Sequence, residues 1–279
     1  MPPPSPPADF VWHRIESGPA SDVDVLLPEG SEIAGLIVTG RYEALHLSIV
    51  SALVSADDVC FDIGGHYGYY TFSLAKLAHK GQVHTFEPVA EHAQRIRRAA
   101  EKSSLLNVSV HEAAVAGEVG KMSLQLASKP GGDDSMAYLE SYGGVDTPAA
   151  QEHYAGFSRR TVSTLTLDSL LSDSTLGNNA PSSLPNFIKI DAEGAEVAIV
   201  GAALQMLAVK KPRLLIEMHG VYEALGCAQI LSKVGYRAIL LTEQKTTMPI
   251  LWTSRDDDEA LQSVRRVLGH APTVLFDRQ

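Results

Sequence analysis

The chain has 279 residues, 45% of them hydrophobic and 20% charged, which is typical of a soluble globular protein with a substantial core. A formal net charge of −10 excludes nucleic acid as the main partner, because binding a polyphosphate requires a basic surface. Only two cysteines are present, Cys60 and Cys227. Two isolated cysteines exclude a disulfide framework and a zinc site, and they suit a reducing cytoplasm.

The chain begins with a proline-rich segment, MPPPSPPADF, whose prolines favour an extended conformation. The segment lacks the basic and apolar regions of a secretory signal, and no apolar run approaches the roughly 18 residues that span a bilayer. We therefore expect a cytoplasmic protein without a membrane span. Residues 10–40 are mixed and turn-rich and predict one or two strands, so the tail and this extension form a first unit, residues 1–40.

Residues 41–279 are predicted to form a single domain in which strands and helices alternate. Helices of crossover length between strands imply a parallel sheet that is covered on both faces, so we predict a doubly wound α/β domain. The predicted helices are 42–54, 69–78, 90–103, 195–208 and 221–234, and the predicted strands are 58–63, 82–87, 108–115, 121–127, 187–191, 213–218, 236–241 and 273–276.

One long insertion interrupts this alternation. Residues 128–160 lack clear periodicity and are rich in Gly, Asp, Ser and Tyr. A loop of this length inside a compact domain is either a disordered surface insertion or a functional lid, and we predict a lid that covers the substrate.

Residues that follow the first strand are the first candidates for a site, because ligands bind outside the carboxyl ends of the strands in a doubly wound sheet. They are Asp62, Gly64, Gly65, His66 and Gly68. A dinucleotide fingerprint requires a second glycine where His66 stands, and Asp62 would repel a pyrophosphate. An acidic residue before the glycine turn suits a ligand with an ammonium and a sulfonium group. The pattern therefore points to S-adenosylmethionine.

The next two strands supply further candidates for binding this cofactor. Glu87 ends the second strand, where a carboxylate accepts hydrogen bonds from both ribose hydroxyls, and Pro88 stops the strand and fixes the direction of Glu87. The third strand ends near Glu112, Ala113 and Ala114, which we expect to flank the adenine ring.

Acidic residues and a histidine follow the last two parallel strands. Asp191 ends an apolar strand and faces the predicted cleft, whereas the dipole of the following helix is enough to explain Glu193 and Glu196. Glu217 and His219 share one face of the next strand because side chains alternate with a period of two. Asp191 and His219 are therefore candidate catalytic residues at the same edge of the sheet.

Six stretches of this chain resemble the FkbM-type methyltransferases in order and spacing. They are DDVCFDIGGHYGYYTFSLA, VHTFEP, VSVHEAAV, TLTLDSLL, FIKIDAEGAE and LLIEMHG, and the resemblance covers roughly residues 40–245. It implies the class I methyltransferase sheet of seven strands, ordered 3-2-1-4-5-7-6 with the seventh strand antiparallel. It also implies S-adenosylmethionine as cofactor, S-adenosylhomocysteine as product and a hydroxyl group as the usual acceptor.

The resemblance extends to individual residues of the predicted site. Asp62, Gly64, Gly68, Glu87 and Asp191 match the family's motifs directly. The sequence departs from the family at 65–67, where Gly-His-Tyr stands in place of the more typical Ala-Asn-x. We expect His66 to take the place of the Asn and to face the methionine end of the cofactor.

The predicted reaction is methylation of a hydroxyl group on a small molecule or glycan, such as a sugar, polyketide or other secondary metabolite. An alcohol is a poor nucleophile until a base removes its proton. We expect Asp191 or His219 to be that base, with Glu217 orienting the histidine. We predict no metal ion, and a divalent cation held by acids at neighbouring strand ends is the second choice.

Two other classes of function stay open. One is a methyltransferase-like scaffold that binds the cofactor without catalysis. The other is an NAD-binding oxidoreductase, which His66 disfavours because it replaces the second glycine of the dinucleotide fingerprint. The sequence also permits a homodimer.

Overall fold

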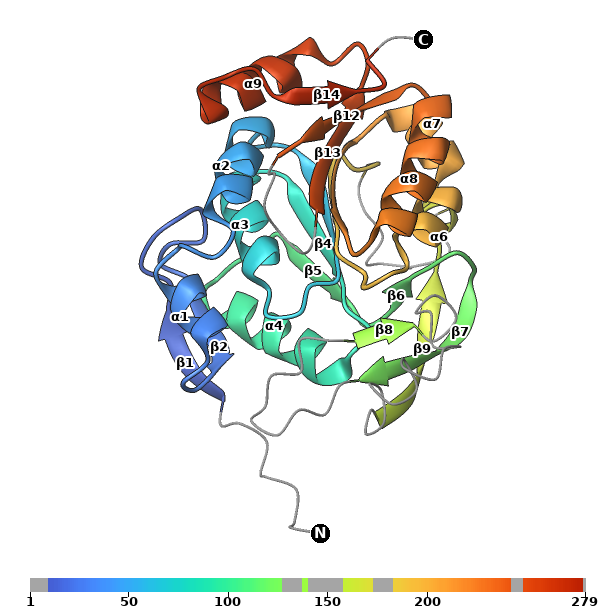
Figure 1. The fold of residues 1–279 in the computed structure, drawn as a ribbon. Coiled ribbons are helices and arrows are strands. Elements are labelled where there is room, and N and C mark those ends of the chain that lie inside the picture. Colours follow the sequence, from blue (N-terminus) through green and yellow to red (C-terminus); the bar gives the residue numbers. More distant parts are fainter. Residues whose placement is uncertain (1–9, 127–136, 140–157, 173–182, 242–247, 278–279) are drawn as a thin grey trace.

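A computed structural model describes residues 10–126, 137–139, 158–172, 183–241 and 248–277, and it is built around one large sheet (Figure 1). The sheet has eight strands in the order β14-β12-β13-β11-β10-β3-β4-β5. Strands β11, β10, β3, β4 and β5 are parallel neighbours, whereas β13 is antiparallel to both β11 and β12. The strands are β3 (Val59–Ile63), β4 (Gln82–Phe86), β5 (Val108–His111), β10 (Phe187–Ile190), β11 (Arg213–Met218), β12 (Tyr236–Leu240), β13 (Met248–Ser254) and β14 (Thr273–Leu275).

Helices cover both faces of this sheet, as the predicted α/β class requires. Cys60 on β3 packs into the core formed with α2, α3, α4 and α9, and its neighbour Phe61 packs into the core formed with α6, α7 and α8. Both faces are therefore apolar, and every residue of β3 is buried. The helices on the first face are α2 (Ala44–Leu53), α3 (Tyr69–Leu77), α4 (Ala90–Lys102) and α9 (Asp258–Leu268), and those on the second are α6 (Glu196–Gly201), α7 (Leu204–Lys210) and α8 (Val221–Lys233).

The strand order agrees with the predicted class I arrangement, but the strand count differs. The prediction of seven strands omitted β13 and took the segment at 273–276 as the last strand. In the structure β13 is the antiparallel seventh strand, and β14 adds an eighth at the edge. β13 was not predicted because Pro249 lies within its apolar run. A proline in such a run argues against a central strand. Pro249 lies opposite Glu217, next to the amino end of β13.

The amino-terminal extension shares the core of the large domain. Its predicted strands are β1 (Phe10–Arg14) and β2 (Asp24–Pro28), an antiparallel pair that is followed by α1 (Glu32–Val38). Ile15, Leu27 and Ile37 belong to the same buried cluster as the side chains of α2, α3 and α4. The extension therefore packs as part of the domain.

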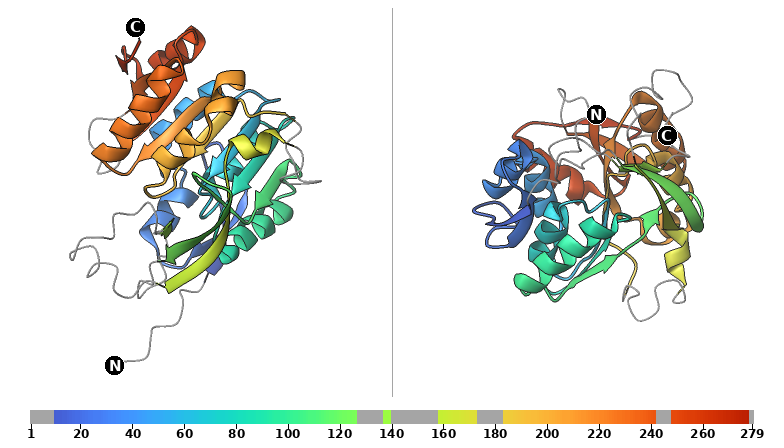
Figure 2. Two further views of the ribbon diagram at one scale, coloured as in Figure 1. Left: turned by 90° about the vertical axis from the view of Figure 1, so that its right-hand side faces the viewer. Right: turned by 90° about the horizontal axis from the view of Figure 1, so that it is seen from below.

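A second, smaller sheet lies beside the carboxyl ends of the large sheet, on the opposite side of α4 from the amino-terminal hairpin (Figures 1 and 2). Its strand order is β6-β9-β7-β8. The predicted strand 108–115 is divided between the sheets, because its first half is β5 and its second half is β6. The strands are β6 (Ala114–Val115), β7 (Gly120–Leu126), β8 (Ala137–Leu139) and β9 (Ser158–Leu165), and the short helix η1 (Asp168–Leu171) follows.

The predicted lid, residues 128–160, falls mostly outside the described residues. Within it the structure describes β8 and the first three residues of β9, and both strands pair with β7. Among the described residues, no helix combines the length and the hydropathy that crossing a membrane requires.

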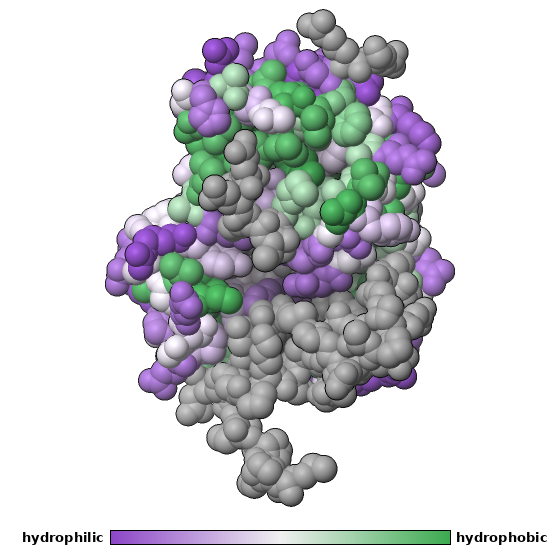
Figure 3. Space-filling model, in the orientation of Figure 1, coloured by the Kyte–Doolittle hydropathy of each residue, from purple (hydrophilic) through white to green (hydrophobic). Residues whose placement is uncertain are grey.

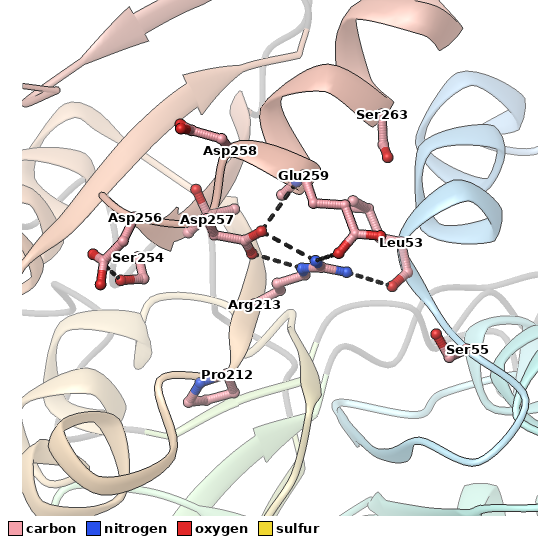
Figure 4. A network of polar contacts seen from close by, with 12 residues as sticks. Leu53, Ser55, Pro212, Arg213, Ser254, Asp256, Asp257, Asp258, Glu259 and Ser263 are labelled. Atoms are coloured by element: carbon pink, nitrogen blue, oxygen red, sulfur yellow. Dashed lines mark hydrogen bonds and ion pairs between the residues drawn. The ribbon is translucent and has the colours of Figure 1, made fainter.

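One partly buried arginine contacts both α2 and α9 from the start of β11 (Figure 4). Arg213 begins β11 and donates two hydrogen bonds to Asp257, with Nε–Oδ2 and Nη2–Oδ1 distances of 2.7 and 3.1 Å. Its Nη1 donates to the carbonyl oxygen of Leu53 at the end of α2. Asp257 in turn caps α9 by accepting a hydrogen bond from the amide of Ala260. This network fixes where α2 and α9 meet the sheet.

Candidate active site

A cavity of about 560 Å³ lies at the carboxyl ends of β3, β4, β10 and β11. This is the edge of a doubly wound sheet where ligands bind. The face of the molecule drawn in Figure 3 is hollowed across its middle, and hydrophilic side chains gather along the hollow. The cavity brings together most of the predicted site residues, namely Gly64, Gly65, His66, Glu87, Pro88, Ala114, Asp191, Glu217 and His219. Asp62, Gly68, Glu112 and Ala113 do not belong to its lining.

The glycine turn after β3 is shaped by close packing of the protein itself. Gly64 has a φ of +86°, and a Cβ at this position would overlap with the carbonyl oxygen of Asp191 at the end of β10. Gly68 has a φ of +83°, and a Cβ there would overlap with the ring of Phe72. Glycine is therefore required at both positions, because its backbone adopts positive φ without strain and it leaves room for these atoms.

Asp62 is buried and does not line the cavity. Its side chain is 1% exposed and accepts a hydrogen bond from Oγ1 of Thr71 over 2.6 Å. Burial raises the pKa of Asp62 to about 6, although the Thr71 hydrogen bond and the charge of Lys189 act in the opposite direction.

Glu87 lines the cavity, and its carboxylate holds the glycine turn in place. Oε2 accepts a hydrogen bond from the backbone amide of His66 over 2.9 Å, and Oε1 accepts one from the amide of Val89 over 2.8 Å. Nδ1 of His92 lies 3.5 Å from Oε1. Burial tends to raise the pKa of Glu87, but the hydrogen bonds and the charge of His92 outweigh it, and the pKa is lowered. Glu87 is therefore an ionised acceptor with lone pairs available to a ligand.

His66 has a left-handed backbone conformation, with a φ of +45°. Its ring packs against that of Tyr67, with a centroid distance of 3.6 Å, and lies edge-on to His92 at 5.1 Å. Histidine and asparagine adopt positive φ more readily than most residues. A His at this position is therefore compatible with the left-handed turn, as the Asn typical of the resembling family would be.

One end of the cavity is apolar. Phe86, Ala114, Val115, Leu124 and Leu139 line it, and the two leucines come from β7 and β8 of the small sheet. The sequence did not single out these leucines, because the alternating pattern of a strand does not show which cavity or segment its apolar face packs against.

Glu112 was expected at this end, and its side chain lies elsewhere. It is half exposed, and its Oε2 is 3.7 Å from Nη1 of Arg97 on α4.

The other end of the cavity is acidic. Asp191, Glu193 and Glu217 line it together with Lys189, whose side chain is 2% exposed. Nζ of Lys189 is 3.1 Å from Oδ2 of Asp191 and lies over the ring of Tyr70 at 4.9 Å from its centroid. Burial tends to lower the pKa of Lys189, but Asp191 and other nearby carboxylates outweigh it, so the pKa is raised and the lysine stays charged.

His219 lies among three carboxylates. Its Nδ1 donates a hydrogen bond to Oε1 of Glu196 over 2.9 Å, and its Nε2 is 3.5 Å from both Oδ1 of Asp191 and Oε2 of Glu193. Glu196 therefore orients the ring in the structure, the role that the sequence assigned to Glu217. Glu196 begins α6 and is fully buried, and its Oε1 also accepts hydrogen bonds from the amides of the turn before the helix.

The carboxylates around His219 determine its charge. Burial alone lowers the pKa of His219, but the hydrogen bond to Glu196 and the charges of Glu193 and Asp191 outweigh it and raise the pKa to about 9. Burial and the nearby acids Asp191, Glu196 and Glu217 raise the pKa of Glu193 to about 7, although His219 acts to lower it. At neutral pH the imidazole is therefore cationic in the protein without ligands.

Tyr42 and Glu43 also line the cavity, and the sequence did not point to them as site residues. Glu43 precedes α2, and its Oε2 accepts a hydrogen bond from the hydroxyl of Tyr70 over 2.6 Å. Burial alone raises the pKa of Glu43, but hydrogen bonds from His46 and Tyr70 and the charge of Lys189 lower it to about 2. Only the packing of α2 against the sheet brings these residues to the site.

Comparison with known proteins places the chain in a family. The model of the methyltransferase FkbM domain matches residues 62–238, which is more than half of the chain. No curated protein matches.

Similar solved structures include an FkbM methyltransferase from Methylobacillus flagellatus KT, with 13% sequence identity and a TM-score of 0.49 over 79% of this chain and 52% of that one. They also include M. jannaschii TYW2 in complex with AdoMet, with 10% identity and a TM-score of 0.47 over 89% and 86% of the two chains. The chain thus spans about half the length of the Methylobacillus structure. By the match to the domain model, the chain belongs to the FkbM methyltransferase family.

Proposed function

We propose that this protein is an S-adenosylmethionine-dependent methyltransferase that acts on a hydroxyl group of a small molecule or glycan. The observation that carries the proposal is the polarity of the cavity at the strand ends, which is apolar near the small sheet and acidic near β10 and β11. Such a cavity matches a cofactor with an aromatic base at one end and positive charge at the other. The family of the chain supports methyl transfer as the reaction.

The residues present fit this cofactor from end to end. The apolar end, with Leu124 and Leu139, suits the adenine ring. Glu87 is an ionised acceptor at the end of β4, where a carboxylate holds ribose hydroxyls. Carboxylates at the acidic end attract the ammonium and sulfonium groups. When bound, the cofactor supplies a methyl group on a positively charged sulfur, which an oxygen nucleophile takes with loss of its own proton while the C–S electron pair stays on sulfur.

The protein's contribution at the acidic end is to bind and orient the acceptor hydroxyl and to take up its proton. In the absence of a metal ion, Asp191 is the best-placed proton acceptor, because it lines the cavity and its side chain is 37% exposed. His219 is a hydrogen-bond donor at neutral pH because its pKa is about 9, so it suits binding of the acceptor oxygen better than removal of the proton.

Calorimetric titration of the full chain with S-adenosylhomocysteine and, separately, with NAD tests the cofactor. We expect S-adenosylhomocysteine to bind and NAD to show no heat of binding, because the glycine turn lacks the dinucleotide fingerprint. Binding of NAD in preference to S-adenosylhomocysteine would overturn the proposal.

The reaction itself is tested by incubating the chain and S-adenosylmethionine with panels of hydroxylated sugars and polyketides. We expect a mass increase of one methyl group on an acceptor. Cofactor binding without a methylated product across such panels would favour the non-catalytic scaffold.

A further inference from the structure

We propose that Asp191, Glu193 and His219 form a binding site for a divalent metal ion of the Mg²⁺ or Mn²⁺ class. The inference rests on the proposed function in one respect, since it assigns the metal to the acceptor end of that cavity. From the sequence alone, a divalent cation held by acids at neighbouring strand ends was the second choice after a metal-free site. The tertiary structure brings these side chains to one point.

The ligand atoms have the spacing that a metal ion requires. One oxygen of each carboxylate and Nε2 of His219 all lie within 4.8 Å of one another. Nε2 is 3.5 Å from Oδ1 of Asp191 and 3.5 Å from Oε2 of Glu193. Neighbouring ligands of an octahedral ion with bonds of about 2.1 Å are about 3 Å apart, so small rotations of the side chains are enough to close the site.

Glu196 supplies an independent sign of a cation, because it lies behind the imidazole and not among the ligands. A histidine that binds a metal almost always donates its other ring N–H to a carboxylate, which fixes the ring and its tautomer. The Nδ1–Oε1 hydrogen bond to Glu196 has this arrangement and turns Nε2 toward the two carboxylates. Oε2 of Glu196 is buried and has no hydrogen-bond partner in the described part of the chain, so its charge favours a cation in front of the ring.

Lys189 leaves the site open. It contacts Oδ2 of Asp191, whereas Oδ1 of the same carboxylate faces His219. The side chains of Asp191 and Glu193 are about one-third exposed, so an ion has access from solvent. Two carboxylates and one imidazole leave coordination positions for water and for an acceptor oxygen, and carboxylate-rich sites of this kind suit Mg²⁺ and Mn²⁺.

The metal ion would act on the acceptor hydroxyl. Coordination of the hydroxyl oxygen lowers its pKa, so that its proton leaves to solvent and the oxygen becomes a stronger nucleophile. Asp191 then serves as a ligand and no longer as the proton acceptor.

Mn²⁺ binding to the full chain tests this site without relying on activity. The chain is stripped with EDTA, desalted and titrated with Mn²⁺, and the signal of free Mn²⁺ is followed by electron paramagnetic resonance. We expect one bound ion per chain, competition by Mg²⁺, and an electron spin echo coupling to one imidazole nitrogen. Glu193→Gln should weaken binding at least about tenfold because it removes one charged ligand. Glu101→Gln, an exposed substitution on α4, should bind Mn²⁺ as the unaltered chain does.

Two results would overturn the metal site. One is failure of the unaltered chain to bind Mn²⁺, and the other is equal binding by the Glu193→Gln and Glu101→Gln variants. His219→Gln is a second variant, in which the nitrogen coupling must disappear. Titration of the same samples with S-adenosylhomocysteine keeps the two proposals separate. Normal S-adenosylhomocysteine binding without Mn²⁺ binding rejects the metal alone, and Mn²⁺ binding without S-adenosylhomocysteine binding rejects the proposed cofactor.

Discussion

The carboxylate of Glu196 accepts a hydrogen bond from Nδ1 of His219 over 2.9 Å, and this contact joins the first turn of α6 to the end of β11. Glu196 is fully buried, so the contact fixes the direction in which the other ring nitrogen points. The position of the histidine in the cavity thus depends on a residue that does not itself line the cavity.

Replacing Glu196 by Gln is expected to lower kcat about 10- to 100-fold with little change in affinity for S-adenosylhomocysteine. The neutral amide no longer compels Nδ1 to carry the proton, so Nε2 loses its fixed role at the acceptor end. Steady-state kinetics and calorimetry measure the two effects. Glu217→Gln is the matched comparison, and ¹⁵N NMR of the imidazole reports the state of His219 in both variants. A larger change in the histidine ¹⁵N signals in Glu217→Gln than in Glu196→Gln would contradict the assignment of Glu196.

The effect of a substitution at His66 should depend on how well the new residue tolerates the left-handed backbone conformation at this position. Ala at a φ of +45° costs about 1 kcal/mol or more, whereas Asn tolerates this region. We therefore expect His66→Ala to lower both the thermal midpoint and the affinity for S-adenosylhomocysteine, and His66→Asn to retain most of both. Equal behaviour of the two variants would show that the backbone conformation at this position does not matter.

Glu87→Gln is expected to weaken binding of S-adenosylhomocysteine about tenfold or more, because hydrogen bonds to a charged acceptor are stronger than those to an amide. The amide also weakens the contacts to the amides of His66 and Val89, which shape the glycine turn. Calorimetry measures the affinity. Glu112→Gln should bind like the unaltered chain, since Glu112 pairs with Arg97 away from the cavity, and a loss of affinity in that variant would restore the sequence-based expectation.

Stability should fall in mild acid because of a buried histidine pair. Nδ1 of His84 is 3.0 Å from Nε2 of His111, and burial lowers the pKa of each to about 4, helped by the charge of His111 on His84 and of Arg97 on His111. The unfolded chain takes up these protons near pH 6.5 and the folded chain does not. Stability from this pair is therefore present above pH 6.5 and is lost as the pH falls toward 4, by about 1 kcal/mol per pH unit for each histidine.

Urea unfolding at pH 7.5, 6 and 5 measures this slope. A His111→Phe variant should show a smaller slope, because it removes one titrating ring and keeps the stacking on Phe86. The exposed His79→Asn is the control, and an equal slope in all three proteins would argue against the pair.

Arg213→Ala is expected to lower the free energy of unfolding by about 2–4 kcal/mol, because Asp257 and the carbonyl of Leu53 lose a partly buried charged partner. Arg213→Lys should recover only part of this loss, since a lysine cannot make the two-pronged contact with Asp257 (Figure 4). Denaturant unfolding measures both. Asp256→Asn, a substitution of an exposed neighbour, should change stability little.

The sequence by itself determined the local features of this protein, which depend only on residues close together along the chain. The alternation of strands and helices, the glycine turn after β3 and the acids at the strand ends follow from periodicity and turn chemistry over a few residues. The α/β class was predicted for this reason, and most of the predicted site residues line the cavity. β13 escaped prediction because Pro249 contradicts the local pattern of a central strand, and only pairing with β11 and β12 makes it one.

Tertiary structure decided which side chains meet. Asp62 matches its motif, but its buried carboxyl group accepts a hydrogen bond from Thr71 and does not line the cavity, while Leu124 and Leu139 reach the cavity from another sheet. Glu193, Glu196 and His219 converge because β10 and β11 are adjacent parallel strands, whose carboxyl ends meet at one edge. Periodicity specifies the face on which a residue lies, but contacts between segments depend on how those faces pack.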